Sequence, residues 1–130
     1  MSATQQNHDT LRTPEFDNFG PWIYEIKTLE DIPRLFIPYA DEIISADFRI
    51  KIPRNLERRN ANASMDLYEV VIGVYKDSLL ILRRLPNGTV ERLFLSLTDL
   101  LAIKNYRQFN YGEITLYLPP NRQIQLTYNA

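Results

Sequence analysis

The C-terminal part of the chain alternates apolar and polar residues with the period of a β-strand. Every second residue of 114–118 is aliphatic, and every second residue of 124–128 is aliphatic or tyrosine. Because successive side chains of a strand point to opposite faces, each segment predicts a strand with one buried and one solvent-facing side. The Pro-Pro-Asn-Arg sequence at 119–122 joins the two segments, so they are expected to form a hairpin.

The middle of the chain predicts a three-stranded antiparallel meander. The β-rich runs 67–76 and 79–85 are separated by the polar pair 77–78, which favours a hairpin. The Asn-Gly pair at 87–88 follows, before a third run at 90–95. Asn-Gly favours a type I′ turn, because both central residues of that turn need a positive φ.

A further β-rich run covers residues 43–52 and stops at Pro53. Its second half alternates apolar with basic residues, which predicts a half-buried strand. The apolar positions are Phe48, Ile50 and Ile52, and the solvent-facing positions are Arg49 and Lys51. Residues 54–65 are polar and rich in Arg and Asn, and they predict a long loop.

The segment between the meander and the last hairpin predicts one more strand. Residues 96–99 favour a turn or a single helical turn. A strand is expected over 100–106, with Leu101 and Ile103 facing inward, and a loop over 107–112.

The N-terminal third has weaker patterns. Residues 1–13 are polar and predict a disordered tail. Residues 14–24 mix proline, glycine and aromatic residues, which indicates an irregular arm whose aromatics dock on the domain. A short helix is expected within 28–40, with Thr28 as its N-cap and Pro38 ending or kinking it.

These elements predict a mainly β fold of seven antiparallel strands, arranged as an orthogonal sandwich or a partly open barrel. The chain has 130 residues, of which 45% are hydrophobic and 24% charged, so it fits one domain with a core of its own.

The order of the elements resembles the bacterial pleckstrin-homology-like domain, including the kind found beside membrane segments in uncharacterised proteins. Four stretches carry the resemblance: EIISADFRI (42–50), VVIGVYKDSLLILRR (70–84), LFLSLTDLLAI (93–103) and GEITLYLPPNRQIQLTYNA (112–130). The resemblance implies a domain over 42–130, preceded by an arm at 14–41 and the tail. It also implies two nearly orthogonal sheets of seven strands, closed at one end by a C-terminal helix.

The chain departs from that pattern because Ala130 comes just after the last strand, with no segment for the closing helix. Three interpretations follow. The arm could plug the open corner with Trp22, Leu35 and Phe36, or a partner subunit could cover it. In the third, which the resemblance favours, this chain is the N-terminal piece of a longer, membrane-anchored protein.

The composition excludes several classes of chemistry. The chain has no cysteine, which excludes a disulfide framework, a thiolate nucleophile and a cysteine-ligated metal. No apolar run approaches the roughly 20 residues that cross a bilayer, and the polar N-terminus is not a secretory signal. We therefore expect a cytoplasmic protein, which could lie at the cytoplasmic face of a membrane.

No catalytic constellation emerges from the residue types. His8 stands alone in the tail, and the four glycines are not clustered. A Ser-His-Asp triad, a histidine-based metal site and a phosphate-cradling loop all lack their parts. Paired carboxylates remain at 41–42 and at Asp66 with Glu69, but acids in loops are usually solvated. We expect no enzyme activity, cofactor or metal.

One basic segment is hidden by the overall charge of −1. Residues 1–47 hold nine acids and three bases, whereas 48–62 hold five bases and one acid. Arginine forks match phosphate oxygens, and the resemblance places this segment where relatives hold lipid headgroups. The candidate phosphate or anionic-lipid ligands are Lys51, Arg54, Arg58 and Arg59. The favoured alternative is a solvated loop whose arginines pair with the acidic N-terminal third.

The aromatic residues around 106–111 form a second candidate surface. Tyr106, Phe109 and Tyr111 flank Arg107, and such a cluster could stack single-stranded nucleic acid. The absence of an RNP-type motif and the acidic net charge disfavour that function. Tyrosine-rich surfaces also bind proteins, although the same residues could fill the core.

We therefore expect a non-catalytic interaction module that mediates protein association, including self-association. Binding of phosphate headgroups or anionic lipid through the basic loop is the alternative, and single-stranded nucleic-acid binding is a second one.

Overall fold

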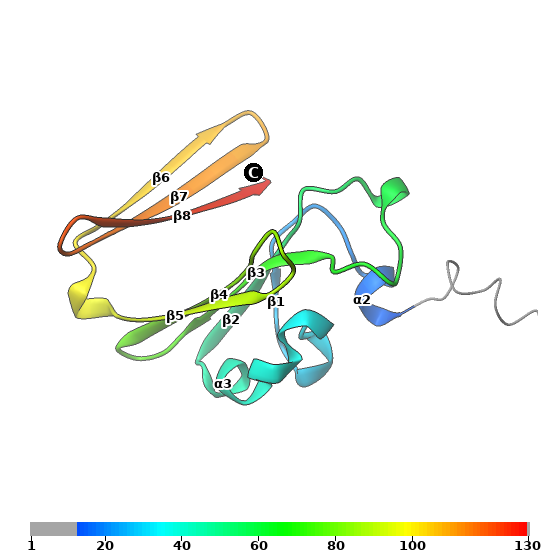
Figure 1. Cartoon of the computed structure of the whole chain (residues 1–130), viewed down its shortest axis with the longest axis horizontal. Helices are drawn as coiled ribbons and strands as arrows, with labels where there is room; N and C mark the ends of the chain where they lie inside the picture. The colour runs from blue at the N-terminus through cyan, green and yellow to red at the C-terminus, as the bar shows by residue number, and fades with distance from the viewer. Residues whose placement is uncertain (1–12, 130) are drawn as a thin grey trace, which may run out of the picture.

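The strands of the computed structural model, which describes residues 13–129, form two antiparallel sheets that face each other (Figure 1). The first sheet has the order β1-β2-β3-β4-β5, and the second has the order β6-β7-β8. The strands are β1 Tyr24–Glu25, β2 Phe48–Pro53, β3 Tyr68–Val74, β4 Ser78–Arg84, β5 Val90–Ser96, β6 Ala102–Gln108, β7 Tyr111–Leu118 and β8 Arg122–Asn129. The mainly β prediction is confirmed. The prediction of seven strands is wrong, because the described residues hold eight, and they do not form a closed barrel.

Short helices connect and cover the strands. They are α2 Pro14–Asp17, η1 Leu29–Asp31, η2 Arg34–Tyr39, α3 Ala40–Ser45, η3 Arg58–Asn60 and η4 Leu97–Asp99. The segment from η1 to α3 packs on one face of the first sheet, opposite the second sheet (Figure 1). The fold therefore has three layers, with the five-stranded sheet in the middle.

The middle sheet is buried on both faces, which explains the near-continuous hydrophobic runs in β3 and β4. One core cluster joins its outer face to the helical layer, and its buried members include Phe19, Ile26, Phe36, Ile43, Val71, Leu80 and Leu82. A second cluster joins its inner face to the second sheet, and its buried members are Ile52, Val70, Ile81, Leu95, Leu116, Leu118, Ile124 and Leu126. The two sets of sheet residues alternate along β3 and β4, as the strand period requires.

The predicted strand over 43–52 is half wrong. Ile43 and Ile44 belong to the helix α3, and the strand β2 begins only at Phe48. Ile43 is completely buried in the helical layer. Burial against the sheet therefore overrides the β propensity of these isoleucines. The short helix expected within 28–40 is present as the two 3-10 helices η1 and η2, and Pro38 lies inside the second.

The face of β2 that was expected to meet solvent is covered instead. Lys51 is only 7% exposed, whereas Phe48 on the opposite face is 48% exposed. The cause is the helical layer, which covers this face: the Nζ of Lys51 donates to the carbonyl oxygen of Asp31 on η1 at 2.8 Å.

The arm does not plug the space between the two sheets with the residues expected to do so. Phe36 is buried in the outer core cluster, Leu35 packs against that cluster, and Trp22 is 52% exposed. Ile23 is the arm residue that packs against the inner cluster. The tail predicted over 1–13 lies outside the described residues except for Thr13, whose side-chain hydroxyl accepts a hydrogen bond from the Phe16 backbone N–H at 3.0 Å.

The hairpins at 67–85 and 113–128 are confirmed, but the Asn-Gly turn has another geometry. Gly88 has a φ of +86°, whereas Asn87 is not among the described residues with positive φ. The Gly88 N–H donates to the carbonyl oxygen of Leu85, and the Leu85 N–H donates to that of Thr89. Pro86 holds a negative φ at the first central position, so the loop is a turn followed by a left-handed glycine rather than type I′.

Among the described residues, none of the helices has the length and hydropathy that a bilayer crossing requires.

Candidate interaction surface

Strand β6 is one of the two edges of the three-stranded sheet, and β7 lies on its one paired side (Figure 1). All seven residues of β6 are solvent-exposed. The strand starts at Ala102 and ends at Gln108, two residues later than the sequence predicted. An uncovered edge presents free backbone N–H and C=O groups to any other extended segment.

One row of aligned side chains across the second sheet contains two buried residues and one exposed residue. Ile103 on β6 is aligned with Leu116 on β7, and Leu116 with Ile124 on β8. Leu116 and Ile124 are each 4% exposed, whereas Ile103 is 62% exposed. The sequence correctly predicted that Ile103 faces the inner side, but the inner core cluster does not reach it.

Leu101, just before β6, is bare in the same way and is 68% exposed. Its backbone N–H donates to the carbonyl oxygen of Tyr117 at 2.8 Å, so the chain is already attached to the sheet at this position. We call Leu101 and Ile103 the bare pair. The expectation that the pair is buried is wrong, because β6 extends beyond the cover that the first sheet provides.

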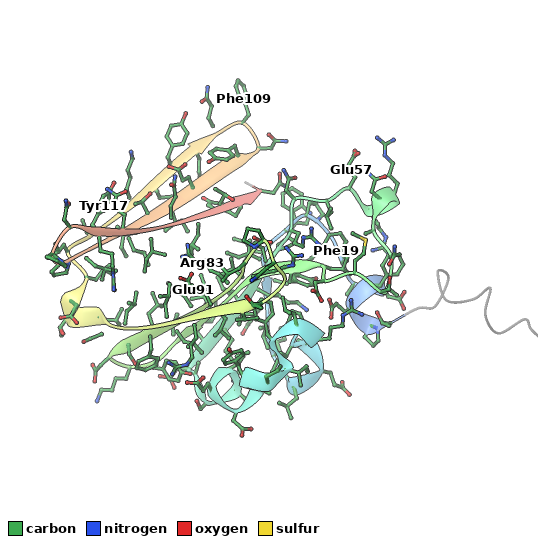
Figure 2. The ribbon with its side chains drawn as sticks, viewed as in Figure 1. Phe19, Glu57, Arg83, Glu91, Phe109 and Tyr117 are labelled. Carbon is green, nitrogen blue, oxygen red and sulfur yellow. The ribbon has the colours of Figure 1, made fainter. Side chains whose placement is uncertain are left out.

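The turn between β6 and β7 carries the three aromatic residues predicted from the sequence. Phe109 has a φ of 55° and is 91% exposed, and it points away from the body of the protein (Figure 2). Tyr106 and Tyr111 lie on the outer face of the sheet beside this turn, at 43% and 44% exposure. The loop predicted over 107–112 is therefore a tight turn, and it gathers the three rings at one end of the hairpin.

The hydroxyls of both tyrosines are engaged within the hairpin. Tyr111 donates to a carboxylate oxygen of Glu113 at 2.9 Å, and Tyr106 donates to the side-chain oxygen of Gln108. The hydrogen bond to Glu113 raises the pKa of Tyr111. The two rings are held as exposed apolar surfaces, which suits protein contact.

The predicted phosphate ligands do not form one site, because their charged groups are directed at different parts of the protein. Lys51 is buried, and its Nζ donates to the carbonyl oxygen of Asp31 at 2.8 Å. Arg54 donates to the carbonyl oxygen of Asp66 at 2.8 Å. Arg58 donates to the carbonyl oxygens of Phe16 and Phe19 at 2.7 and 2.9 Å.

The exposed Arg59 pairs with Glu57 on the same loop at 3.0 Å. Three of the four cations therefore hold backbone carbonyls of the arm and the loop. Anionic-lipid binding stays a prediction that this geometry does not support.

Two of the four carboxylates considered for catalysis are engaged in separate ion pairs. Glu42 pairs with Arg92, and Asp66 pairs with Arg34 at 3.4 Å. Glu69 lines a cleft of about 580 Å³ at one end of the two sheets, together with Arg54, Arg84, Tyr111 and Tyr128 among others. Within residues 13–129, no three His, Asp or Glu side chains converge as a metal site would require.

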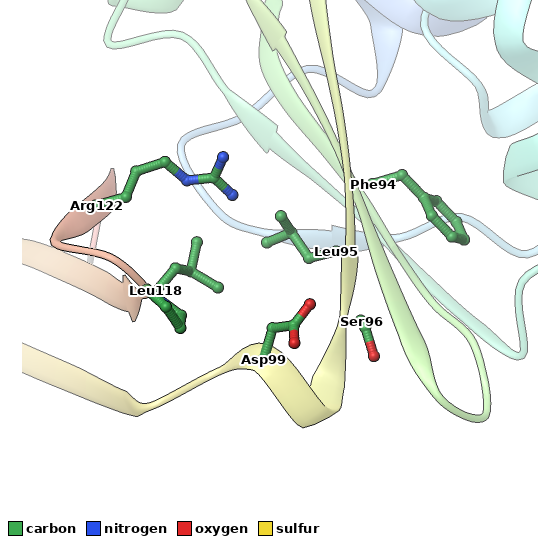
Figure 3. Close-up of a pocket in the computed structure, with 7 residues that line it drawn as sticks. Phe94, Leu95, Ser96, Asp99, Leu118 and Arg122 are labelled. Atoms are coloured by element: carbon green, nitrogen blue, oxygen red, sulfur yellow. The ribbon is translucent and has the colours of Figure 1, made fainter.

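A smaller pocket of about 300 Å³ lies where the last hairpin meets β5 and η4 (Figure 3). Arg122 and Leu118 reach into it from the second sheet, Leu95 from β5, and Asp99 from η4. Asp99 is the one acid among its lining residues. A second carboxylate for acid–base chemistry is therefore missing from this lining.

The exposure of the bare pair could not be predicted from the sequence, because its apolar–polar alternation is the same as that of buried strands. The aromatic turn was identified from its composition. Comparisons of this chain with models of protein families, with curated proteins and with solved structures found no match.

Proposed function

We propose that this chain is a non-catalytic interaction module that binds protein by adding a strand to β6. The observation that supports the proposal is the row Ile103–Leu116–Ile124, in which the first member is 62% exposed and the others 4%. A strand added beside β6 would extend the apolar row and satisfy the free backbone groups of the edge.

The aromatic turn strengthens the proposal. Phe109, Tyr106 and Tyr111 stand at the far end of the same strand as the bare pair. Aromatic side chains with a large exposed area are enriched at protein interfaces. The surface therefore consists of an apolar end at 101–103 and an aromatic end at 106–111.

The resemblance to a pleckstrin-homology-like domain is part of this proposal. When the two-residue strand β1 is set aside, four strands of the first sheet and three of the second remain in sequential antiparallel order. The domain would then serve as a scaffold that presents β6.

Site-specific photo-crosslinking in cells that express the full chain tests the proposal. A photoreactive phenylalanine analogue replaces Ile103 in one variant and Ile37 in a matched control, because Ile37 on η2 is also half exposed, at 50%. We expect discrete protein adducts from position 103, and fewer from position 37. Equal adduct patterns at the two positions, or none at 103, would overturn the proposal.

A further inference from the structure

We infer that the cleft at one end of the two sheets binds a carboxylate group, carried by a small organic acid or by the C-terminus of a peptide. The inference goes beyond strand addition, because the two arginines that support it, Arg54 and Arg84, do not lie on β6. It is independent of the proposed function, and either can fail without the other.

The cleft has the size and the mixed walls of a ligand site. Its volume is about 580 Å³, within the range of roughly 300–1,000 Å³ that is usual for small-molecule sites. Its walls come from the arm, from the first sheet with the loop after β2, and from the second sheet, which meet at this end of the molecule (Figure 1). Three prolines and Leu56 line it with apolar surface, and three asparagines and Thr127 line it with hydrogen-bonding groups.

Arg84 is a cation of this lining that gives up no hydrogen bond when it meets a ligand. Its Nε is buried and has no hydrogen-bond partner among the described residues. Its ion pair with Asp66 measures 3.9 Å from Nε to Oδ2, which is longer than a hydrogen bond, and Asp66 is also shared with Arg34 at 3.4 Å. A buried N–H group without an acceptor is costly. The side chain is 19% exposed and lines the cleft, so an acceptor that enters the cleft can attract the guanidinium.

Arg54 adds a second guanidinium to the same cleft. Its Nη1 donates to the backbone carbonyl oxygen of Asp66 at 2.8 Å. Within residues 13–129 that is the one hydrogen bond of its side chain, whereas an arginine carries five N–H donors. Asp66 therefore positions Arg54 through its backbone and leaves donors for a ligand.

The charges of the lining favour a carboxylate over a doubly charged anion. Arg54 and Arg84 contribute two positive charges and Glu69 one negative charge, so the lining has a net charge of +1. A carboxylate carries one negative charge, and its two oxygens match the fork of a guanidinium. A second negative charge on the ligand would lie uncompensated beside Glu69.

The uncharged part of the lining suits the rest of such an acid. Asparagine amides donate and accept hydrogen bonds at the same time, so they match peptide groups as well as hydroxyls. The prolines and Leu56 offer contact to an apolar body. A peptide C-terminus and a free organic acid share this chemistry.

NMR titration of the isotope-labelled full chain tests the inference. The probes are N-acetyl-alanyl-leucine, its C-terminal amide, and isovalerate, which keeps a carboxylate and an apolar body without a peptide group. The backbone amides of Arg54, Asn55 and Arg84 report on the cleft. We expect saturable shifts of these amides with at least one of the two carboxylates, and none with the peptide amide.

The two carboxylates distinguish the sources of the ligand. Tighter binding of the peptide acid assigns a peptide C-terminus, whereas equal or tighter binding of isovalerate assigns a free organic acid. An absence of saturable shifts with both carboxylates would overturn the inference, and so would equal shifts with the peptide amide.

Charge variants locate the binding. Arg84→Gln should weaken binding of the carboxylate at least about tenfold, because it removes a charge-assisted fork. Arg84→Lys keeps the charge without the fork, so it should weaken binding about fivefold, and it serves as the test if Arg84→Gln does not fold. Glu69→Gln should tighten binding about threefold, because it removes a repelling charge.

Arg59→Gln is the matched control. It removes the same charge from an exposed loop position outside the cleft, and should change the dissociation constant less than about twofold. Equal weakening by the substitutions at Arg59 and Arg84 would show that the shifts report the overall charge of the protein, and would overturn the site.

Discussion

The side chain of Lys51 donates a hydrogen bond from its Nζ to the carbonyl oxygen of Asp31 at 2.8 Å. Lys51 is 7% exposed, and its ammonium also lies 4.7 Å from the centroid of the Tyr68 ring. The Asp31 carboxylate in turn accepts hydrogen bonds from the backbone N–H groups of Lys27 and Thr28. A residue that the sequence marks as a ligand for phosphate therefore attaches the helical layer to the central sheet.

Replacing Lys51 by alanine should destabilise the fold. The Lys51→Ala variant removes buried methylenes and leaves the carbonyl oxygen of Asp31 without its donor, so we expect a loss of about 2–4 kcal/mol in the free energy of unfolding. Urea denaturation measures this loss. The matched variant Lys76→Ala, at an exposed position, should change stability by less than about 0.5 kcal/mol. Equal effects of the two substitutions would contradict the structural role.

The contribution of Lys51 to the free energy of unfolding should change with pH in the alkaline range. Burial lowers the pKa of Lys51 below its ordinary value of 10.5, although the charges of Asp31 and Glu15 partly offset this effect. The unfolded chain then binds this proton more tightly than the folded protein, so the free energy of unfolding rises with pH up to the ordinary lysine pKa. The stability of the wild type relative to Lys51→Met should therefore increase from pH 8 to pH 10 in urea titrations. A flat difference would show that burial does not disfavour the charge.

Alanine substitutions of Arg58 and Arg59 should have very different effects on the stability of α2, although the two residues are neighbours in the chain. Arg58 holds the carbonyl oxygens of Phe16 and Phe19, and its guanidinium lies 4.6 Å from the centroid of the Phe16 ring. Arg58→Ala should release α2, so that hydrogen exchange at the Asn18 and Phe19 amides becomes at least about tenfold faster, the equivalent of roughly 1.4 kcal/mol. Arg59→Ala should leave these amides unchanged.

The same pair of variants also tests the lipid alternative. If the basic loop bound anionic vesicles, Arg59→Ala would weaken vesicle co-sedimentation, since the exposed Arg59 would be the cation best placed to meet a headgroup. We expect no binding to anionic vesicles that depends on Arg59.

The pairing of Glu42 with Arg92 should be sensitive to acid. Arg92 donates from Nε to Glu42 at 2.9 Å, and this hydrogen bond lowers the pKa of the glutamate. A carboxylate whose pKa is lower in the folded state stabilises the fold above its ordinary pKa, and loses that effect as pH falls through the folded value. Both side chains are more than a third exposed, so Glu42→Gln should cost less than about 1 kcal/mol at pH 7. The difference in unfolding free energy between Glu42→Gln and wild type should shrink below pH 4.5. Thermal unfolding at pH 7 and at a pH below 4.5 measures this change.

Gly112 should not tolerate a side chain. A Cβ at this position would lie 2.3–2.5 Å from atoms of the Tyr128 ring, which crosses the glycine so that its hydroxyl donates to Asn105 at 2.9 Å. Gly112→Ala should therefore cost about 1–3 kcal/mol in urea denaturation. The double variant with Tyr128→Ala should cost less than the sum of the single variants, because the ring that clashes has been removed. Strict additivity would mean that the two positions do not touch.

The period-2 alternation was enough to predict β7 and β8, because a hairpin that packs on a core buries one face and exposes the other to solvent. The same alternation could not tell that β6 is bare. Ile103 and Leu116 look alike in sequence, and their difference depends on how far the first sheet reaches beneath them. That reach is set by residues far away in the chain.

Other errors have a similar cause. The segment that covers Lys51 includes Asp31 on η1, 20 residues earlier in the chain, and no residue near Lys51 in the sequence indicates that contact. Ile43 is helical because its side chain fits the outer face of the sheet. By contrast, the aromatic turn was found because Tyr106, Phe109 and Tyr111 lie within six consecutive residues. Local composition therefore predicted one end of the candidate surface, and only the tertiary structure revealed the other.

The two core clusters also impose an order on folding during synthesis. The outer cluster draws its members from residues 16–90, whereas half of the buried members of the inner cluster lie on β7 and β8. As the chain leaves the ribosome, the helical layer can close on the first sheet before the second sheet has emerged. Until then the inner face of the first sheet, with Ile52, Val70, Ile81 and Leu95, stays open to water. A chaperone could bind this apolar face until the second sheet covers it.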